Sequence, residues 1–185
     1  MAINLHRTTY ELLEGLKYIK NSPKNFGTLE LIVCRPNIGE RTELVDGVLD
    51  MDNGLVGDNW KTRGSNRTND GTSNAEMQLT LMNSRAIELI AGLKERRKLA
   101  GDQLYVNLNL SPENLPAGTC LQIGDAVIEV TSAPHTGCKA FRERFGIDAL
   151  RFVNSSEGKR LNLRGINSRI IKTGKITLGD EIVKR

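Results

Sequence analysis

Hydrophobic side chains near the N-terminus recur at helical spacing, whereas those after residue 26 follow the alternation of β-strands. The helical positions are Leu12, Leu13, Leu16 and Ile19. Thr8 or Thr9 is a suitable N-cap for this segment, and Pro23 closes it. We therefore expect an N-terminal helical extension, residues 1–26, whose amphipathic helix covers one end of the core of a single domain, residues 27–185.

Short segments with strand character fill most of the predicted domain. Alternation over residues 28–33 places Leu29, Leu31 and Val33 on one face and Cys34 on the other. We interpret Cys34 as structural; the alternative is that it lines the same pocket as Cys138. Further predicted strands are residues 43–48, 78–82, 104–108, 119–123, 126–131, 164–171, 175–178 and 181–183. Many short strands with glycine turns and no β-α-β rhythm predict a mainly β fold with peripheral helices (α+β), closed or nearly closed as a β-barrel.

Helices are predicted at a few places among these strands. Asn83 or Ser84 caps a helix that ends at Gly92. A second helix begins near Thr136 and ends at Gly146, and a further helical stretch covers residues 148–154.

A long polar loop spans residues 61–74 between two of the predicted strands. It carries Lys61, Arg63 and Arg67 among glycine, serine, threonine and asparagine. Cations on such a loop suit the binding of an anionic ligand. A solvated surface loop is an equally good interpretation of the same composition.

Composition narrows the class of protein. The chain has 185 residues, 38% hydrophobic and 26% charged, which is typical of a folded globular domain. A net charge of +4 favours an anionic ligand, and 4% aromatic residues are too few for a nucleic-acid stacking surface. Three cysteines without a Cys-x-x-Cys pair argue against a disulfide framework and a structural zinc site. Without a signal-peptide core or a membrane-length apolar run, we expect a cytoplasmic protein with no membrane or nucleic-acid partner.

Cys138 is the strongest candidate for a reactive group. If Thr136 caps the following helix, Cys138 lies in its first turn, with Lys139 beside it and Arg142 one turn further on. A helix N-terminus and nearby cations lower the pKa of a thiol and so supply thiolate. His135, three residues upstream, is placed to assist proton transfer. The alternative is a buried structural cysteine, as we interpret Cys120 in its predicted strand.

Seven short motifs follow one another along the domain, at residues 54–58, 78–81, 101–108, 121–131, 134–138, 164–166 and 174–180. In this order they resemble the MOSC domain, the C-terminal domain of molybdenum cofactor sulfurases that also occurs as free-standing bacterial proteins. The resemblance covers about residues 27–184. It implies a β-barrel related to the barrel domain of pyruvate kinase. It also implies a site for the pterin phosphate of the molybdenum cofactor.

The same resemblance implies roles for individual residues. A cysteine of the family carries sulfane sulfur or ligates molybdenum, and by position that cysteine is Cys138. Asn107 matches the asparagine of the family's Glu-Asn-Leu motif, and Asp58 matches its Gly-Asp. The chain departs from the family at two places: Asn59-Trp60 replaces a frequent Arg-His, and Gly137 replaces the proline that often precedes the cysteine.

Three hypotheses for function follow. In the first, the Cys138 thiolate accepts sulfur as a persulfide from a cysteine desulfurase and transfers it to a molybdoenzyme, so that pyridoxal phosphate belongs to the partner. In the second, Cys138 ligates molybdenum in a reductase of N-hydroxylated compounds. In the third, the barrel only binds an anion or a partner protein. The predicted site has catalytic Cys138 and His135, and its cofactor-binding residues are Asp58, Lys61, Arg63, Arg67, Asn107, Lys139 and Arg142.

Overall fold

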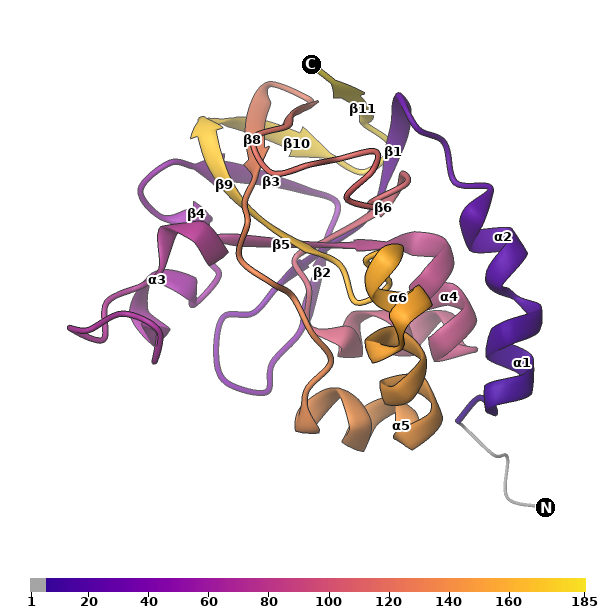
Figure 1. Ribbon diagram of the computed structural model, residues 1–185. Coiled ribbons are helices and arrows are strands. Elements are labelled where there is room, and N and C mark those ends of the chain that lie inside the picture. The colour runs from indigo at the N-terminus through magenta and orange to yellow at the C-terminus, as the bar shows by residue number, and fades with distance from the viewer. Residues whose placement is uncertain (1–5) are drawn as a thin grey trace.

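The computed structural model describes residues 6–185, in which one β-sheet closes as a barrel and helices surround it (Figure 1). Its strands are β1 (Phe26–Cys34), β2 (Thr42–Leu44), β5 (Leu79–Asn83), β6 (Leu104–Asn107), β7 (Cys120–Ile123), β8 (Ala126–Val130), β9 (Ile166–Lys172) and β11 (Glu181–Lys184). Their order is β11-β7-β8-β9-β5-β6-β1-β2, and β1 also pairs with β11, so seven strands close the barrel and β2 lies outside the ring. Because β5 and β6 are parallel and their neighbours antiparallel, the sheet is mixed. The predicted closed barrel with peripheral helices is confirmed.

A second, three-stranded sheet has the order β10-β3-β4, from β3 (Asp46–Asp50), β4 (Gly54–Leu55) and β10 (Gly174–Thr177). The predicted single strand over residues 43–48 is wrong, because the chain changes sheets at Val45. Before Val45, β2 pairs with β1 of the barrel, and after it, β3 pairs with β10 of the second sheet.

The helices are α1 (Thr9–Glu14), α2 (Leu16–Lys20), α3 (Trp60–Arg63), α4 (Ser84–Ala91), α5 (Lys139–Asn154) and α6 (Ser156–Arg160), with 3-10 turns at Ala75–Met77 and Lys94–Ala100. Local sequence explains where they start. Thr8 and Glu11 form a capping box at α1, and Asn83 Oδ1 accepts a hydrogen bond from the N–H of Ala86 at 3.0 Å at α4. Both predicted caps are confirmed.

Helix α5 differs from its prediction at one end. Gly146, with φ of 88°, interrupts it, as the predicted helix end there requires. Thr136 is not the cap, however: Cys138 occupies the N-cap position and the helix begins at Lys139. The predicted first-turn position of Cys138 is therefore wrong by one residue.

Two hydrophobic clusters stabilise the fold, one inside the barrel and one between the barrel and its helices. Strand β1 contributes to both because its register with β6 shifts between Leu29 and Leu31. Leu29 lies inside the barrel with Cys34, whereas Val33 faces the helices. The predicted common face of Leu29, Leu31 and Val33 is therefore wrong, since a bulge reverses the alternation.

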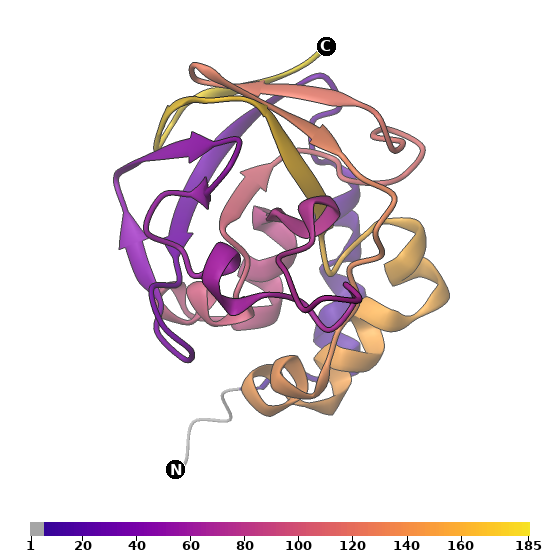
Figure 2. The same cartoon turned by 90° about the vertical axis from the view of Figure 1, so that its left-hand side faces the viewer.

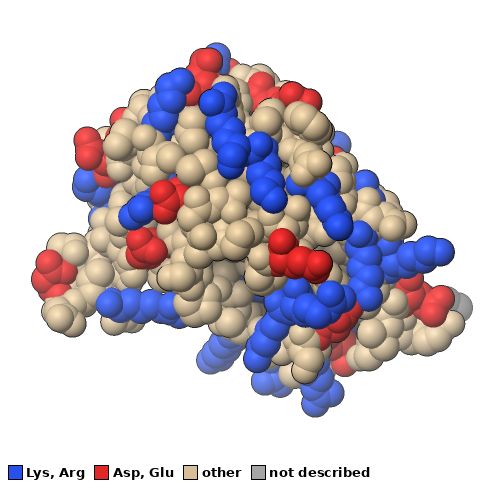
Figure 3. Space-filling view, turned by 45° about the horizontal axis from the view of Figure 1, so that its top comes forward, with Lys and Arg blue, Asp and Glu red and all other residues tan. Residues whose placement is uncertain are grey.

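Charged groups are mixed over the surface. On the face drawn in Figure 3, basic side chains are scattered with acidic ones among them. Among the described helices, none combines the length and the apolar character that crossing a membrane requires.

Candidate functional site

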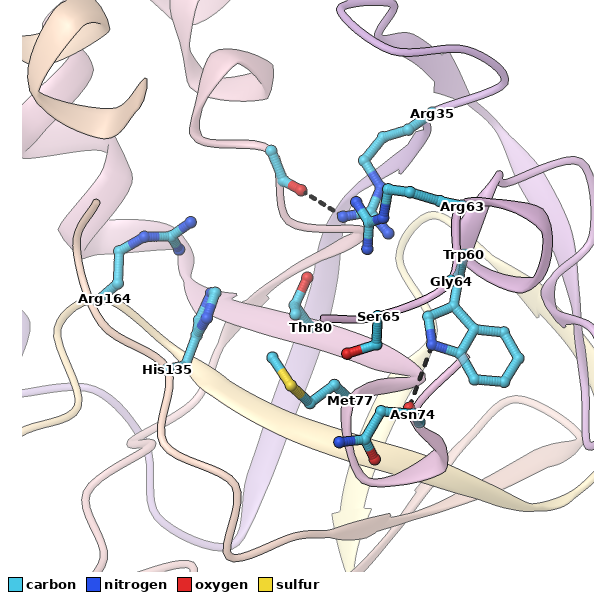
Figure 4. Close-up of a pocket in the computed structure, with 11 residues that line it drawn as sticks. Arg35, Trp60, Arg63, Gly64, Ser65, Asn74, Met77, Thr80, His135 and Arg164 are labelled. Carbon is cyan, nitrogen blue, oxygen red and sulfur yellow. Dashed lines mark hydrogen bonds between the residues drawn. The ribbon is translucent and has the colours of Figure 1, made fainter. Parts of the chain in front are cut away.

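A pocket opens at one side of the barrel, between the segment after α3 and the extended segment that leads from β8 to α5. Figure 2 shows the backbone of both segments. It has about 630 Å³ of empty space, part of it open to solvent. The cavity volume that compares with those of ligand sites is about 200 Å³, a little below their usual range of roughly 300–1,000 Å³. Its basic lining residues are Arg35, Arg63, His135 and Arg164, with Trp60 and Met77 among the others (Figure 4).

Arg35 is held in the pocket wall by a buried carboxylate. It directly follows β1, and its Nε and Nη2 donate to the two oxygens of Asp58 at 2.8 Å each. Asp58 also accepts from the backbone N–H groups of Arg35 and Trp60, and its side chain is fully buried. A buried carboxylate with this many donors fixes the position of the guanidinium. Asp58 therefore acts on the pocket through Arg35.

On the opposite side of the pocket, the carboxylate of Asp102 fixes Arg164 and His135 in the same way. Its fully buried carboxylate accepts from Arg164 Nη1 at 2.6 Å and lies 2.7 Å from His135 Nε2. Burial alone would raise the pKa of Asp102, but Arg164 and His135 outweigh it and hold the pKa at about 2. We refer to Arg35, Arg164 and their carboxylates as the arginine wall.

The ionised Asp102 determines which ring nitrogen of His135 carries the proton. Burial and the nearby charge of Arg164 lower the pKa of His135 in spite of Asp102, so the imidazole is neutral at pH 7. An ionised carboxylate only accepts hydrogen bonds, and Nε2 therefore carries the proton. Nδ1 is then an acceptor, and it has no hydrogen-bond partner within residues 6–185.

Arg63 adds a positive charge that the protein does not neutralise. Its side chain has no hydrogen bond or ion pair within the described part of the chain, and burial and the charge of Arg35 lower its pKa. On the other side of the pocket, Arg164 Nε is buried and has no described hydrogen-bond partner. An arginine without a described acceptor, next to arginines held in place by carboxylates, suits an anionic ligand.

Trp60 connects the pocket to the long loop. Its side chain is buried and lines the pocket, and its Nε1 donates to the carbonyl of Asn74 at 3.3 Å. Of the loop cations, only Arg63 lies in the lining as the structure describes it. Lys61 donates to the carbonyl of Asp52, and Arg67 is exposed.

Cys138 lies outside the lining of this pocket as far as the described residues define it. Its thiol is exposed and makes no capping hydrogen bond within the described chain. Lys139 is also exposed, 3.9 Å from Glu143, and Arg142 is exposed one turn along the helix. The three predicted residues form a surface group at the start of α5.

The position of Cys138 depends on Gly137. The side-chain amide of Asn154 pairs with both the N–H and the carbonyl of Gly137, at 2.9 and 3.1 Å. A Cβ at Gly137 would lie 2.8 Å from Leu150 and 2.9 Å from Val153. A proline would lack the N–H and collide with these side chains, which explains why this chain has glycine before the cysteine.

The remaining predicted residues lie elsewhere. Asn107 accepts a hydrogen bond from Arg85 Nε at 2.9 Å and is not in the described lining of the pocket. Cys34 is buried below Gly57, and burial and Asp58 raise the pKa of its thiol. No group of three or more histidine, cysteine or acidic residues suited to hold a metal occurs among the described residues.

Sequence reasoning missed Arg35, Asp102 and Arg164. Asp102 and Arg164 each lie within a motif of the resemblance, yet nothing local distinguishes them from surface charges. Arg35 precedes Pro36, and this pair indicates only the end of a strand. The useful signal was a charged residue at the end of an apolar strand or next to a glycine turn.

Comparison with solved structures shows the same fold in several bacterial proteins. The YuaD protein from Bacillus subtilis matches with a TM-score of 0.63 and 14% identity, over 85% of this chain and 94% of that one. YiiM from Escherichia coli matches with a TM-score of 0.54 and 18% identity, over 85% and 69%. YiiM from Geobacillus stearothermophilus matches with a TM-score of 0.57 and 14% identity, over 86% and 75%.

The sequence also matches a family model. The match is to the MOSC domain and covers residues 34–183. No curated protein sequence matches the chain.

Proposed function

The chain belongs to the MOSC domain family, which is linked to the molybdenum cofactor, and from this premise we propose that it binds the phosphate-bearing pterin and carries sulfur on Cys138. The observation that carries the proposal is the convergence of Arg35, Arg63 and Arg164 on one pocket. Two of these guanidiniums are paired with buried carboxylates, and the third, Arg63, has no ion pair within residues 6–185.

The pocket residues fit an anionic cofactor. The guanidinium of Arg63, which has no hydrogen bond or ion pair within the described chain, is a donor that a phosphate satisfies. Trp60 and Met77 add apolar lining for a flat ring system, and the neutral His135 adds an acceptor. When bound, the cofactor supplies the metal centre toward which the sulfur is directed. The protein supplies the fixed charges that hold the phosphate.

The exposure of Cys138 supports the carrier role. A thiol outside the described pocket lining is accessible to a second protein, which we propose is a cysteine desulfurase that holds its own pyridoxal phosphate. The Cys138 thiolate attacks the outer sulfur of the donor persulfide. A new sulfur–sulfur bond forms on Cys138, the donor's own sulfur–sulfur bond breaks, and the donor leaves as a thiolate. No external oxidant or reductant is needed.

Mass spectrometry after incubation with glutathione persulfide tests the carrier role. We expect a mass increase of one sulfur atom on the peptide that contains Cys138, and its loss in Cys138→Ser but not in Cys120→Ser. Absence of the added sulfur from Cys138 would refute the role. If the protein from a cofactor-competent host instead holds molybdenum that Cys138→Ser releases, Cys138 is a metal ligand and the reductase hypothesis replaces the carrier.

The pocket is tested with a matched pair on one loop. Both side chains are exposed, but Arg63→Gln removes a charge of the pocket lining, whereas Arg67→Gln removes a charge outside the described lining. We expect the first variant to lose about tenfold or more in pterin affinity, which corresponds to one charge-assisted contact, and the second to be unchanged. Equal pterin content in both purified variants and the parent would contradict the assignment.

A further inference from the structure

A second group of arginines meets at Gly101, next to the pocket. Gly101 has a positive φ of 88°, and a Cβ placed on it would lie 3.2 Å from Arg41 Nη2 and 3.5 Å from Arg144 Nη1. Two guanidiniums from distant parts of the chain therefore approach the same point. A side chain on Gly101 would therefore contact both guanidiniums.

The turn that ends at Gly101 holds Arg144 together with two arginines of the pocket. Consecutive carbonyls of residues 99–101 accept from three different arginines: Leu99 from Arg144 Nη1 at 2.6 Å, Ala100 from Arg164 Nη2 at 3.1 Å, and Gly101 from Arg35 Nη1 at 2.9 Å. Because the same turn holds Arg35, Arg164 and Arg144, the second group shares a rigid wall with the pocket.

The two guanidiniums have no acidic partner. The carboxylate next to each arginine in sequence points elsewhere, since Glu40 accepts from Asn37 and Glu143 faces Lys139. Asp58 is the carboxylate that attracts Arg41, but it is paired bidentately with Arg35. No ion pair to Arg41 or Arg144 occurs in residues 6–185, and Arg41 Nε is buried without a described hydrogen-bond partner.

Such an arrangement is unfavourable for the protein alone. Burial and repulsion by Arg144 and Arg35 lower the pKa of Arg41, which shows that the fold holds like charges together. A negative charge between the groups would relieve this repulsion. Nη1 of each guanidinium donates to a backbone carbonyl, of Glu40 for Arg41 and of Leu99 for Arg144, so Nη2 of each remains as the donor for a phosphate oxygen.

We propose that Arg41 and Arg144, on either side of Gly101, form a second anion site that binds a phosphate group at the rim of the pocket. This site is separate from the Arg63 side of the pocket and does not depend on which cofactor the pocket binds. It gives the protein two phosphate-binding positions on the two sides of one glycine. A ligand with two anionic groups, or a second phosphorylated ligand, can then be held beside the first.

Calorimetry with inorganic phosphate tests the site in a buffer without other oxyanions. We expect the Arg41→Gln/Arg144→Gln double variant to bind about tenfold more weakly or worse than the parent, as the loss of charge-assisted contacts predicts. Arg142→Gln is the matched control, because Arg142 lies on the same helix but is exposed, and it should bind like the parent. Inorganic phosphate can also enter the proposed pocket, so Arg63→Gln should lose that component of the binding and keep the rim component, whereas the double variant should lose the rim component and keep the pocket component.

A second measurement guards against misfolding of the double variant. Without phosphate and at low salt, Arg41→Gln alone should raise the melting temperature, because it removes repulsion. Added phosphate should raise the melting temperature of the parent more than that of the variant. A parent protein that does not bind phosphate, unchanged binding in the double variant, or a lower melting temperature for Arg41→Gln without phosphate would each overturn the proposal.

Discussion

The arginine wall and the thiol of Cys138 differ in how firmly the fold holds them. The carboxylates of Asp58 and Asp102 are fully buried and each meets a guanidinium within 2.8 Å. Cys138 is exposed at the start of α5, and its side chain makes no capping hydrogen bond in the described structure. A site that binds charge needs donors fixed before the ligand arrives, whereas a thiol that exchanges sulfur must be reached by another protein. In the proposed function, binding and sulfur transfer are thus separated within one molecule.

The largest expected effect comes from breaking the wall at Asp102. Asp102→Asn should lower the free energy of unfolding by about 3–5 kcal/mol, since it leaves the buried Arg164 without its counter-charge. Urea denaturation at pH 7 measures the change. The control is Asp46→Asn, whose carboxylate is 56% exposed beside Lys175 and should contribute less than about 1 kcal/mol. Equal stability of the two variants would show that the wall is not held by its charges.

Trp60 tests whether the wall extends to the long loop. Trp60→Ala should lower the free energy of unfolding by about 3 kcal/mol or more, as for other buried aromatic side chains. Trp60 is 5% exposed, so the emission of this single tryptophan should be that of a buried indole before any ligand is added. Tyr10→Ala, at a position 71% exposed, is the control. A nearly unchanged melting temperature for Trp60→Ala would instead identify a lid that closes only on the ligand.

Acid should weaken the wall in a defined range of pH. The pKa of Asp102 falls from 3.8 to about 2 on folding, so its stabilisation is complete above about pH 4 and is lost as the pH falls toward 2. That loss amounts to roughly 2 kcal/mol. The lowered pKa of His135 acts in the same direction but begins at a higher pH, below its ordinary value of 6.5. We expect the free energy of unfolding, measured from pH 7 to pH 2, to fall less steeply below pH 4 for Asp102→Asn than for the parent. The same dependence on pH in both proteins would contradict the assignment.

The smallest effect on stability is expected at the thiol. Cys138→Ser should change the free energy of unfolding by less than about 0.5 kcal/mol, as for other exposed positions. Brief iodoacetamide treatment at about pH 6.5, below the ordinary thiol pKa of about 8.5, should nevertheless label Cys138 first. Cys34 is buried with a raised pKa, and Cys120 is half-buried. Peptide mapping that finds either of them labelled ahead of Cys138 would remove it as the reactive cysteine.

Elements whose information is local were predictable from the sequence. The capping box at Thr8, the cap at Asn83 and the break at Gly146 each depend on residues within one or two helical turns. The strands were recognisable for the same reason, and their number with glycine turns indicated a barrel. The bulge in β1 was not, because it arises from pairing with β6 and leaves no mark on the alternation of β1 itself.

The composition of the site was decided by tertiary structure. Arg35 meets Asp58 across 23 positions and Arg164 meets Asp102 across 62, so each pair exists only because strand pairing brings those segments together. Cations close to Cys138 in sequence remain on the surface with it, while cations distant in sequence form the pocket. Sequence determines which residues can carry charge or sulfur. The closure of the barrel determines which of them are buried together, because burial makes an unpaired charge costly and so selects its partner.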